Sequence, residues 1–403
     1  IFLTNYEPGS YLIGWDSLQT EVNPLLAVKR ATHATWEEYQ SFGLTSGMAH
    51  SADLVRAVFA LFISWFLPTS AVRIFFHTLM LYVGGLGFFT LLKYLGFKDR
   101  KQVTAFIGAC FYILNLGTVQ IFSLPFEPFS IFFAMLPWQI YVFLKFAYAE
   151  KITPKHIVAL VMINILASSQ AYLQTIFVVY FICLGFLSFG VFLERVNKKK
   201  LIKRFIVGYG LIILVNLFWI LPQVYFLRTS LSVVTDSKIN QLATDIVTHQ
   251  NFEKGTLNNF ARLEGFYFDL YDTNSNPVFG PWRSHFDNFF IQVLSYLPFV
   301  LVILGLFKKR KSHFGFVSIF IMVSFMLLSN TKAISYFNSL IFSSEFINQI
   351  FRSPFTKFVI PFSLVYSYLF ASGLELLYQR LIGDRAGSRE DKTSDNILFT
   401  TVT

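Results

Sequence analysis

Long apolar segments follow one another through most of this chain, and they limit what it can fold into. We interpret as membrane-crossing helices the segments at about 72–95, 103–122, 131–148, 157–166, 175–193, 205–226, 289–307, 314–328 and 358–377. Charged residues make up only 14% of the 403 residues and hydrophobic residues 54%, whereas about a quarter of a soluble domain is charged. The sequence therefore predicts an all-α, polytopic bundle of transmembrane helices in a lipid bilayer.

Basic residues cluster after every second predicted crossing, and this pattern predicts the topology. The clusters lie at 98–101, 145–155, 198–204, 308–311 and 380–385. Because Lys and Arg are enriched in cytoplasmic loops, we expect a multi-pass protein of the plasma (inner) membrane with these loops inside. The first loop and the loops 123–130, 168–174, 228–287 and 330–357 then face outward. Short clusters between apolar segments do not form one continuous basic face, so the net charge of +10 does not indicate a nucleic-acid partner.

The first outer loop, residues 1–71, is expected to hold two helices that lie in the plane of the membrane. In 24–42, apolar or aromatic side chains recur every three or four residues, as in an interfacial helix. The apolar segment 54–67 is too short to span, Arg56 interrupts its start and Pro68 ends it. We divide the chain into this loop, a transmembrane core at 72–378, and a cytoplasmic tail or truncated next helix at 379–403. Residues 1–3 resemble the end of an apolar helix, so a first transmembrane helix is expected before them.

Asp16 is the candidate catalytic residue, because it places a carboxylate in a polar loop at the expected membrane surface. A base at that depth suits a lipid-linked substrate, whose head group lies there too. The alternatives are that Asp16 caps the helix starting near Pro24 or only solvates the loop. Glu21 and Glu127 are candidate second acids; Glu127 lies between Pro125 and Pro128, and its alternative is a solvated loop acid.

Three cations on the expected outer side oppose the usual charge distribution and suggest an anionic ligand. Arg352 and Lys357 precede the last span, and Arg283 precedes an earlier one. Arg binds phosphate through its planar fork and Lys as a point charge. The alternative is a set of side chains that reach lipid head groups.

Gln170, Tyr172 and Gln174 form a third candidate group, suited to sugar hydroxyls. The two amides lie four residues apart, a spacing that places them on one helix face. The alternative is that they satisfy backbone groups at a broken helix end. No His/Cys spacing typical of a metal site occurs, Cys110 and Cys183 lie in apolar segments, and a divalent cation stays open as a cofactor.

Taken together, these features resemble the GT-C glycosyltransferases, which use polyprenyl-phosphate sugars at the outer membrane face. The resemblance rests on Gly14-Trp15-Asp16-Ser17 in the first outer loop, the in-plane helices, the long late outer loop, and Phe351-Arg352-Ser353-Pro354-Phe355-Thr356-Lys357-Phe358 before a late helix. It is most similar to the membrane core of bacterial alpha-(1,3)-arabinofuranosyltransferases and to YfhO-like membrane proteins. The Asp-Asp or Asp-Glu pair of many such enzymes is absent, since Asp16 stands alone until Glu21.

The resemblance implies transfer of a sugar from a polyprenyl phosphate to an extracytoplasmic glycan or lipid acceptor, with inversion. Asp16 would be the general base, and Arg352, Lys357 and Arg283 would hold the donor phosphate. The competing class is a transporter or lipid flippase, which predicts charged residues near the membrane centre and two related halves. A membrane scaffold without chemistry is a third class, and it leaves Arg352 and Lys357 unexplained.

Overall fold

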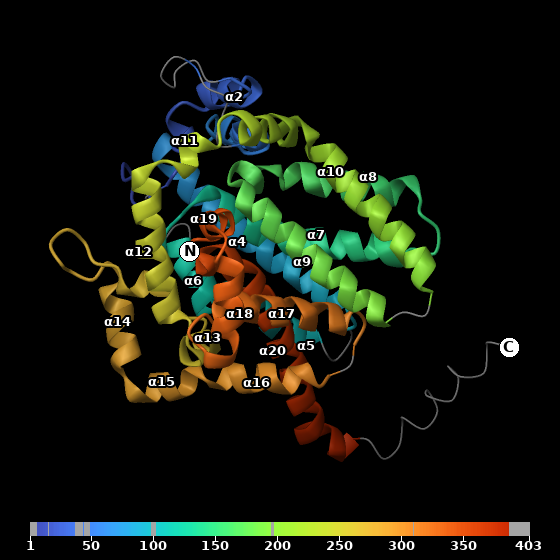
Figure 1. Cartoon of the computed structure of the whole chain (residues 1–403). Coiled ribbons are helices and arrows are strands. Elements are labelled where there is room, and N and C mark those ends of the chain that lie inside the picture. Colours follow the sequence, from blue (N-terminus) through green and yellow to red (C-terminus); the bar gives the residue numbers. More distant parts are fainter. Residues whose placement is uncertain are drawn as a thin grey trace.

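The computed structural model describes residues 6–14, 16–36, 43, 49–97, 102–194, 197–308 and 310–386, and these are mostly helical (Figure 1). The β-structure within these residues is one isolated bridge, between Tyr271 and Pro277. Among the described residues, six helices are long and apolar enough to cross a membrane, or up to eight if each of two bent pairs is one span. The prediction of an all-α, multi-pass membrane protein is confirmed.

The first half of the chain forms a group of long packed helices. They are α4 (Thr69–Tyr94), α5 (Gln102–Leu114), α6 (Leu116–Ser123), α7 (Glu127–Tyr148), α8 (Pro154–Leu166), α9 (Gln174–Glu194) and α10 (Lys198–Thr229), and α7 to α10 lie together in Figure 1. The predicted span 103–122 is bent by 41° between α5 and α6. Asn115 causes the break, because its side chain caps α6 at the Thr118 N–H (3.0 Å) and donates to the Tyr112 carbonyl (3.0 Å).

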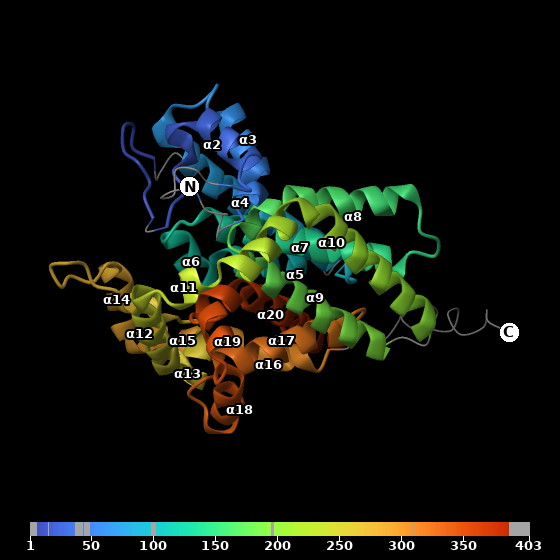
Figure 2. The same ribbon diagram turned by 45° about the horizontal axis from the view of Figure 1, so that its top comes forward.

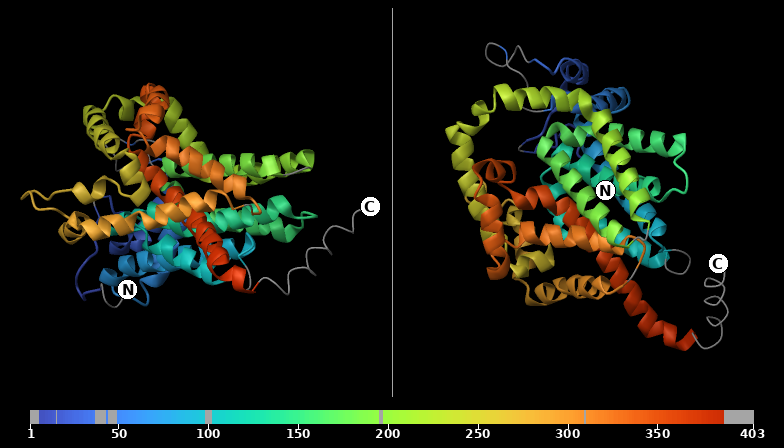
Figure 3. Two further views of the ribbon diagram at one scale, coloured as in Figure 1. Left: turned by 90° about the horizontal axis from the view of Figure 1, so that it is seen from below. Right: turned by 45° about the vertical axis from the view of Figure 1, so that its right-hand side comes forward.

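The second half surrounds the last long helix. Its elements are α11 (Ser232–Thr235), α12 (Lys238–Lys254), α13 (Leu257–Arg262), η5 (Phe266–Asp269), α14 (Gly280–Asp287), α15 (Phe289–Ser295), α16 (Leu297–Leu306), α17 (His313–Leu327), α18 (Lys332–Phe342), α19 (Glu345–Ile350) and α20 (Pro354–Ala386). α20 packs against α16, α17 and α5 and lies centrally in Figure 2. It runs past residue 378, where we had predicted the core to end. Figure 3 shows α10 to α12 curving from the first group of helices to the second.

Short helices fill most of the segments 228–287 and 330–357, for which we predicted outer loops. These helices depend on tertiary contacts. The Asn251 side chain on α12, for example, accepts the Phe355 N–H at the start of α20 (3.1 Å). The predicted span at 314–328 coincides with α17, and the chain then bends by 81° into α18.

The elements of the first loop pack beside one end of the bundle as η1 (Thr20–Val22), α2 (Pro24–Thr32), η2 (His50–Asp53) and α3 (Leu54–Ile63) (Figure 2). The helix predicted at 24–42 is too long, because α2 ends at Thr32, whose hydroxyl donates to the Lys29 carbonyl (2.8 Å). Residues 37–42 lie outside the described part. α3 has ten residues and is too short to span, as predicted.

Several of the predicted basic loops lie together at the other end of the bundle. The Lys311 ammonium lies 4.0 Å from the Tyr94 ring centroid and 4.6 Å from that of Tyr148. The Glu194 carboxylate accepts the Ser312 N–H (2.8 Å). The C-terminal ends of α4, α7 and α9 therefore meet the segment before α17, which agrees with the predicted grouping of these loops on one side.

Two glycines let α16 and α20 pack closely. A Cβ at Gly305 would overlap the Leu369 carbonyl, and a Cβ at Gly373 would overlap the Leu301 carbonyl. Close backbone approach through small residues is a main source of helix association in membranes, where lipid is as apolar as the helix surfaces.

We expect Gly373→Ala to lower the thermal unfolding temperature of the detergent-solubilised protein, because overpacking costs about 1–3 kcal/mol. Gly210→Ala on α10 is the matched control, since nothing lies within 4 Å of an added Cβ there. Equal melting temperatures for the two variants would contradict the close α16–α20 crossing.

Candidate functional site

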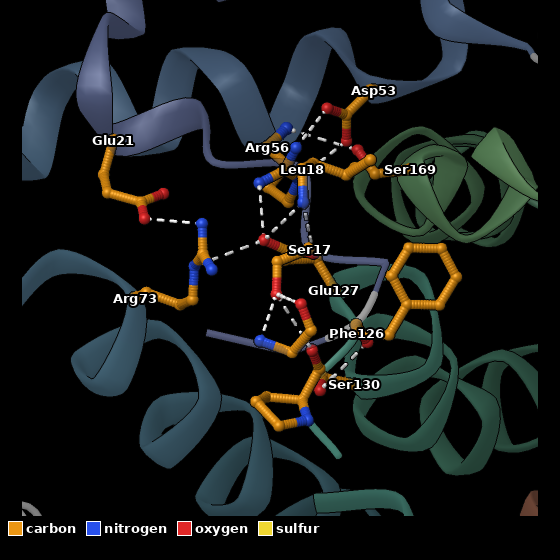
Figure 4. A network of polar contacts seen from close by, with 12 residues as sticks. Ser17, Leu18, Glu21, Asp53, Arg56, Arg73, Phe126, Glu127, Ser130 and Ser169 are labelled. Atoms are coloured by element: carbon orange, nitrogen blue, oxygen red, sulfur yellow. Dashed lines mark hydrogen bonds and ion pairs between the residues drawn. The ribbon is translucent and has the colours of Figure 1, made fainter. Parts of the chain in front are cut away.

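The loop that carries Asp16 is held against the start of α7. A Cβ at Gly14 would overlap the Pro125 carbonyl, so only glycine fits this approach. The Ser17 hydroxyl accepts the Gly14 N–H (2.6 Å), and the Leu18 N–H donates to the Glu127 carboxylate (3.2 Å; Figure 4). Asp16 itself is exposed. The loop is fixed on both sides of Asp16, and this carboxylate faces solvent.

Asp16 does not cap α2. Asn23 is the N-cap residue, and its side chain accepts the Leu26 N–H (3.0 Å). The capping alternative for Asp16 is therefore wrong, which leaves the catalytic role and the solvated-loop role.

Beneath the loop lies a buried charge network, defined by Glu21, Asp53, Arg56, Arg73 and Glu127 (Figure 4). Arg73 pairs with Glu21 (2.5 Å) and with Glu127 (3.6 Å), and Arg56 lies 3.8 Å from Glu127. The Arg56 Nε donates to the Asp53 carboxylate (2.7 Å). All five side chains are buried. The network joins η1, η2, α3, α4 and α7.

The network also holds backbone of the Asp16 loop. The Arg73 guanidinium donates to the Leu12 carbonyl (2.8 Å), and Glu127 accepts the Leu18 N–H. One network residue therefore binds the chain before Asp16 and another binds it after. Because buried charges are costly unless paired and hydrogen-bonded, the loop has one strongly preferred position.

The structure places both candidate second acids, Glu21 and Glu127, in this network. Glu127 is only 1% exposed and begins α7, so the alternative of a solvated loop acid is wrong. With Arg73 and Arg56 as partners, both carboxylates are placed to position the loop.

Burial and charge act in opposite directions on the Asp53–Arg56 pair. Burial raises the pKa of Asp53, and the attraction of Arg56 opposes that rise. Burial lowers the pKa of Arg56, but the negative charges of Asp53 and Glu127 raise it above its ordinary value. Arg56 is therefore charged, and it balances the carboxylates around it.

Asp16 lies within electrostatic range of residues far along the chain. Its negative charge interacts with Lys357 at the start of α20 and with Tyr267 in η5. The positive charge of Arg352 also interacts with Lys357. Burial raises the pKa of Tyr267, and the negative charge of Asp16 raises it further, so its hydroxyl stays protonated. The Lys357 ammonium lies 5.6 Å from the Phe129 ring centroid on α7. The loop of Asp16 and the start of α20 therefore both contact the start of α7.

Arg352 lies in the short connection between α19 and α20. The Thr248 hydroxyl donates to its carbonyl (3.5 Å), and Asn251 binds the neighbouring Ser353 hydroxyl (3.4 Å). Both partners lie on α12, so this helix supports the connection. The side chain of Arg283, the third predicted phosphate ligand, lies outside the described part of the structure.

The candidate group of Gln170, Tyr172 and Gln174 divides between two elements, η4 (Ser168–Tyr172) and α9. Gln170 is buried in η4 and is 1% exposed, whereas Gln174 begins α9 and donates to Gln223 on α10 (2.8 Å). The two do not share a helix face, because the chain breaks at Leu173. The Ser168 hydroxyl donates to the Ala52 carbonyl (3.0 Å), and that of Ser169 accepts the Arg56 N–H (3.2 Å). The serines beside Gln170 thus bind backbone groups at this helix break, and sugar binding by Gln170, Tyr172 and Gln174 stays a prediction.

Sequence reasoning did not find the roles of Asp53, Arg56, Arg73 and Ser169. A signal was present for the arginines, because a charge within an apolar segment requires a partner. Arg73 falls at the start of a predicted span, and Arg56 interrupts the apolar segment before it.

Within the described residues, no three His, Cys, Asp or Glu side chains form a group that could hold a metal ion. Comparisons with protein-family models, with curated proteins and with solved structures found no match for this chain. The fold defines its class as a multi-pass helical membrane protein, and its function has to be argued from the site.

We expect Arg73→Met to destabilise the protein strongly, by about 3–5 kcal/mol, because it leaves the carboxylates of Glu21 and Glu127 buried with less compensating charge. The measurement is thermal unfolding in detergent. Lys29→Met is the control, since Lys29 is an exposed cation on α2. A melting temperature of Arg73→Met equal to that of the control would contradict the network.

Proposed function

We propose that the protein is a GT-C-type glycosyltransferase that moves a sugar from a polyprenyl-phosphate donor to an extracytoplasmic glycan or lipid acceptor. The observation that carries the proposal is that the loop of Asp16 and the Lys357 ammonium both contact the start of α7, the loop at Pro125 and Glu127 and the ammonium at Phe129. The exposed carboxylate on this fixed loop can act as a base. The nearby cations can stabilise a phosphate leaving group. We place this end of the bundle at the outer face of the inner membrane.

In the proposed reaction, the acceptor hydroxyl attacks the anomeric carbon of the donor sugar. Asp16 accepts the hydroxyl proton as the new carbon–oxygen bond forms. The bond between the anomeric carbon and the phosphate oxygen breaks at the same time, and polyprenyl phosphate leaves with the electron pair. Attack opposite the leaving group inverts the anomeric configuration.

Arg352 and Lys357 stabilise the negative charge that grows on the departing phosphate. Arg352 offers a planar fork of donors, whereas Lys357 acts as a point charge. Tyr267, which stays protonated, is a further hydrogen-bond donor near Asp16. The proposal assigns no step to a divalent cation.

We expect Asp16→Asn to reduce transfer from a radiolabelled polyprenyl-phosphate sugar at least about 100-fold, since the amide cannot accept the proton. Donor affinity should stay within about twofold, because Asp16 acts on the acceptor. Glu7→Gln is the matched control, since Glu7 is an exposed acid in the same N-terminal segment. Full turnover by Asp16→Asn would refute its role as base.

We expect Arg352→Ala to weaken donor binding, measured with radiolabelled polyprenyl-phosphate sugar, by about tenfold or more, because a charge-assisted contact is worth about 1.5–3 kcal/mol. Lys332→Ala, which removes an exposed cation from α18, is the control. An unchanged donor affinity would remove Arg352 from the site. Movement of the labelled lipid across the membrane without transfer would favour the flippase class instead.

A further inference from the structure

A cavity of about 400 Å³ lies among the first-loop helices, beside the loop that carries Asp16. Its polar lining comes from several elements and includes Gln19, Arg30, His50, Asp53, Arg56 and Tyr172. Leu18 and Ala27 belong to its apolar lining. This volume is within the usual range of small-ligand pockets, about 300–1,000 Å³.

Leu18 connects the cavity to the candidate catalytic loop. Leu18 lines the cavity, and its backbone N–H donates to Glu127 in the buried charge network. Asp16 precedes Leu18 by two positions in the same fixed loop. A ligand in the cavity therefore lies next to the segment that presents the proposed base.

Gln19, at the cavity wall, has a strained backbone. Its φ of 48° and ψ of 32° are left-handed, a conformation that residues other than glycine rarely adopt. Gln19 lies between Leu18, whose N–H donates to Glu127, and the 3-10 helix η1. Such strain concentrates at ligand-binding positions, and here the exposed Gln19 amide belongs to the lining.

The lining has the chemistry of a saccharide site. The Tyr172 ring is held edge-on by His50, with centroids 5.0 Å apart and an interplanar angle of 82°. An aromatic ring packs against the apolar face of a sugar, and amides such as that of Gln19 hydrogen-bond its hydroxyls.

The lining contains charges of both signs, because Asp53 lies there with Arg30 and Arg56, so it does not form the purely cationic surface expected of a phosphate site. Arg56, the buried cation of the lining, already lies between Asp53 and Glu127. Its charge is compensated, so it leaves little attraction for a further anion.

We propose that this cavity binds the neutral saccharide end of the acceptor, with Tyr172 as the stacking ring and Gln19 as a hydrogen-bonding group. The inference rests on the proposed function, because it treats Asp16 as the base. It adds a place for the acceptor among the first-loop helices, beside the loop that carries Asp16.

The test is equilibrium dialysis of tritium-labelled neutral disaccharides, of hexose and of pentose configuration, against the full chain in lipid nanodiscs. We expect saturable binding of at least one probe, weakened more than tenfold by Ala27→Trp, which fills the cavity. Leu25→Trp is the matched control on α2, since Leu25 is 67% exposed and does not line the cavity; it should bind normally. Tyr172→Ala gives a second variant that removes the ring without adding bulk.

Absence of saturable binding by every probe overturns the proposal, and so does binding that neither Ala27→Trp nor Tyr172→Ala weakens. Asp16→Asn separates this proposal from the proposed function, because it should keep disaccharide binding while losing transfer. Cavity-dependent binding by a protein that transfers no sugar in any form would support the saccharide site and refute the transferase.

Discussion

The pairing of Arg73 and Arg56 with buried carboxylates is the interaction on which the candidate site depends. Glu21, Asp53 and Glu127 come from separate segments of the chain, and each is satisfied only when the arginines lie between them. In a low-dielectric interior, an unpaired member of such a set is costly. The network therefore fixes how the first-loop helices sit on α4 and α7, and it fixes the backbone on both sides of Asp16.

The position of the Asp16 loop determines which chemical groups are exposed at this end of the bundle. Glycine at position 14 allows the loop to approach the Pro125 carbonyl, and Glu127 holds the Leu18 N–H. Asp16 is left exposed at a point where it acts on Lys357 and Tyr267. On the other side of the same loop, Leu18 lines the cavity that we assign to an acceptor saccharide. The inverting transfer that we propose requires a base between a cationic region and a hydroxyl-binding region, and we assign the role of base to Asp16.

Much of the transmembrane architecture was predictable, because long apolar segments report membrane spans without any knowledge of tertiary contacts. α4, α7, α9, α10 and α20 all fall on predicted spans. The helices within 228–287 were not predictable in the same way. α12, for instance, is polar along much of its length, and it is held by contacts such as that of Asn251 with the start of α20.

The candidate site was predictable only in its separate parts. The sequence identified Asp16 as an acid in a polar loop and Arg352 and Lys357 as cations on the expected outer side, but it contained no information on their distance. It also gave Glu127 the wrong environment, because its partner Arg73 lies more than 50 positions earlier in the chain. Ion pairs between residues so far apart in the sequence form only when the helices pack, so the sequence alone does not show them.

The most direct test of the account is a spin-label distance measurement by double electron–electron resonance in nanodiscs. Cys110 and Cys183, the native free cysteines, would be replaced by Ala, and labels attached at Asp16→Cys with Arg352→Cys, and at Asp16→Cys with Lys311→Cys. The account predicts a short distance for the first pair, and for the second a distance comparable to the hydrocarbon core, about 30 Å. A first-pair distance as long as that of the second would contradict it.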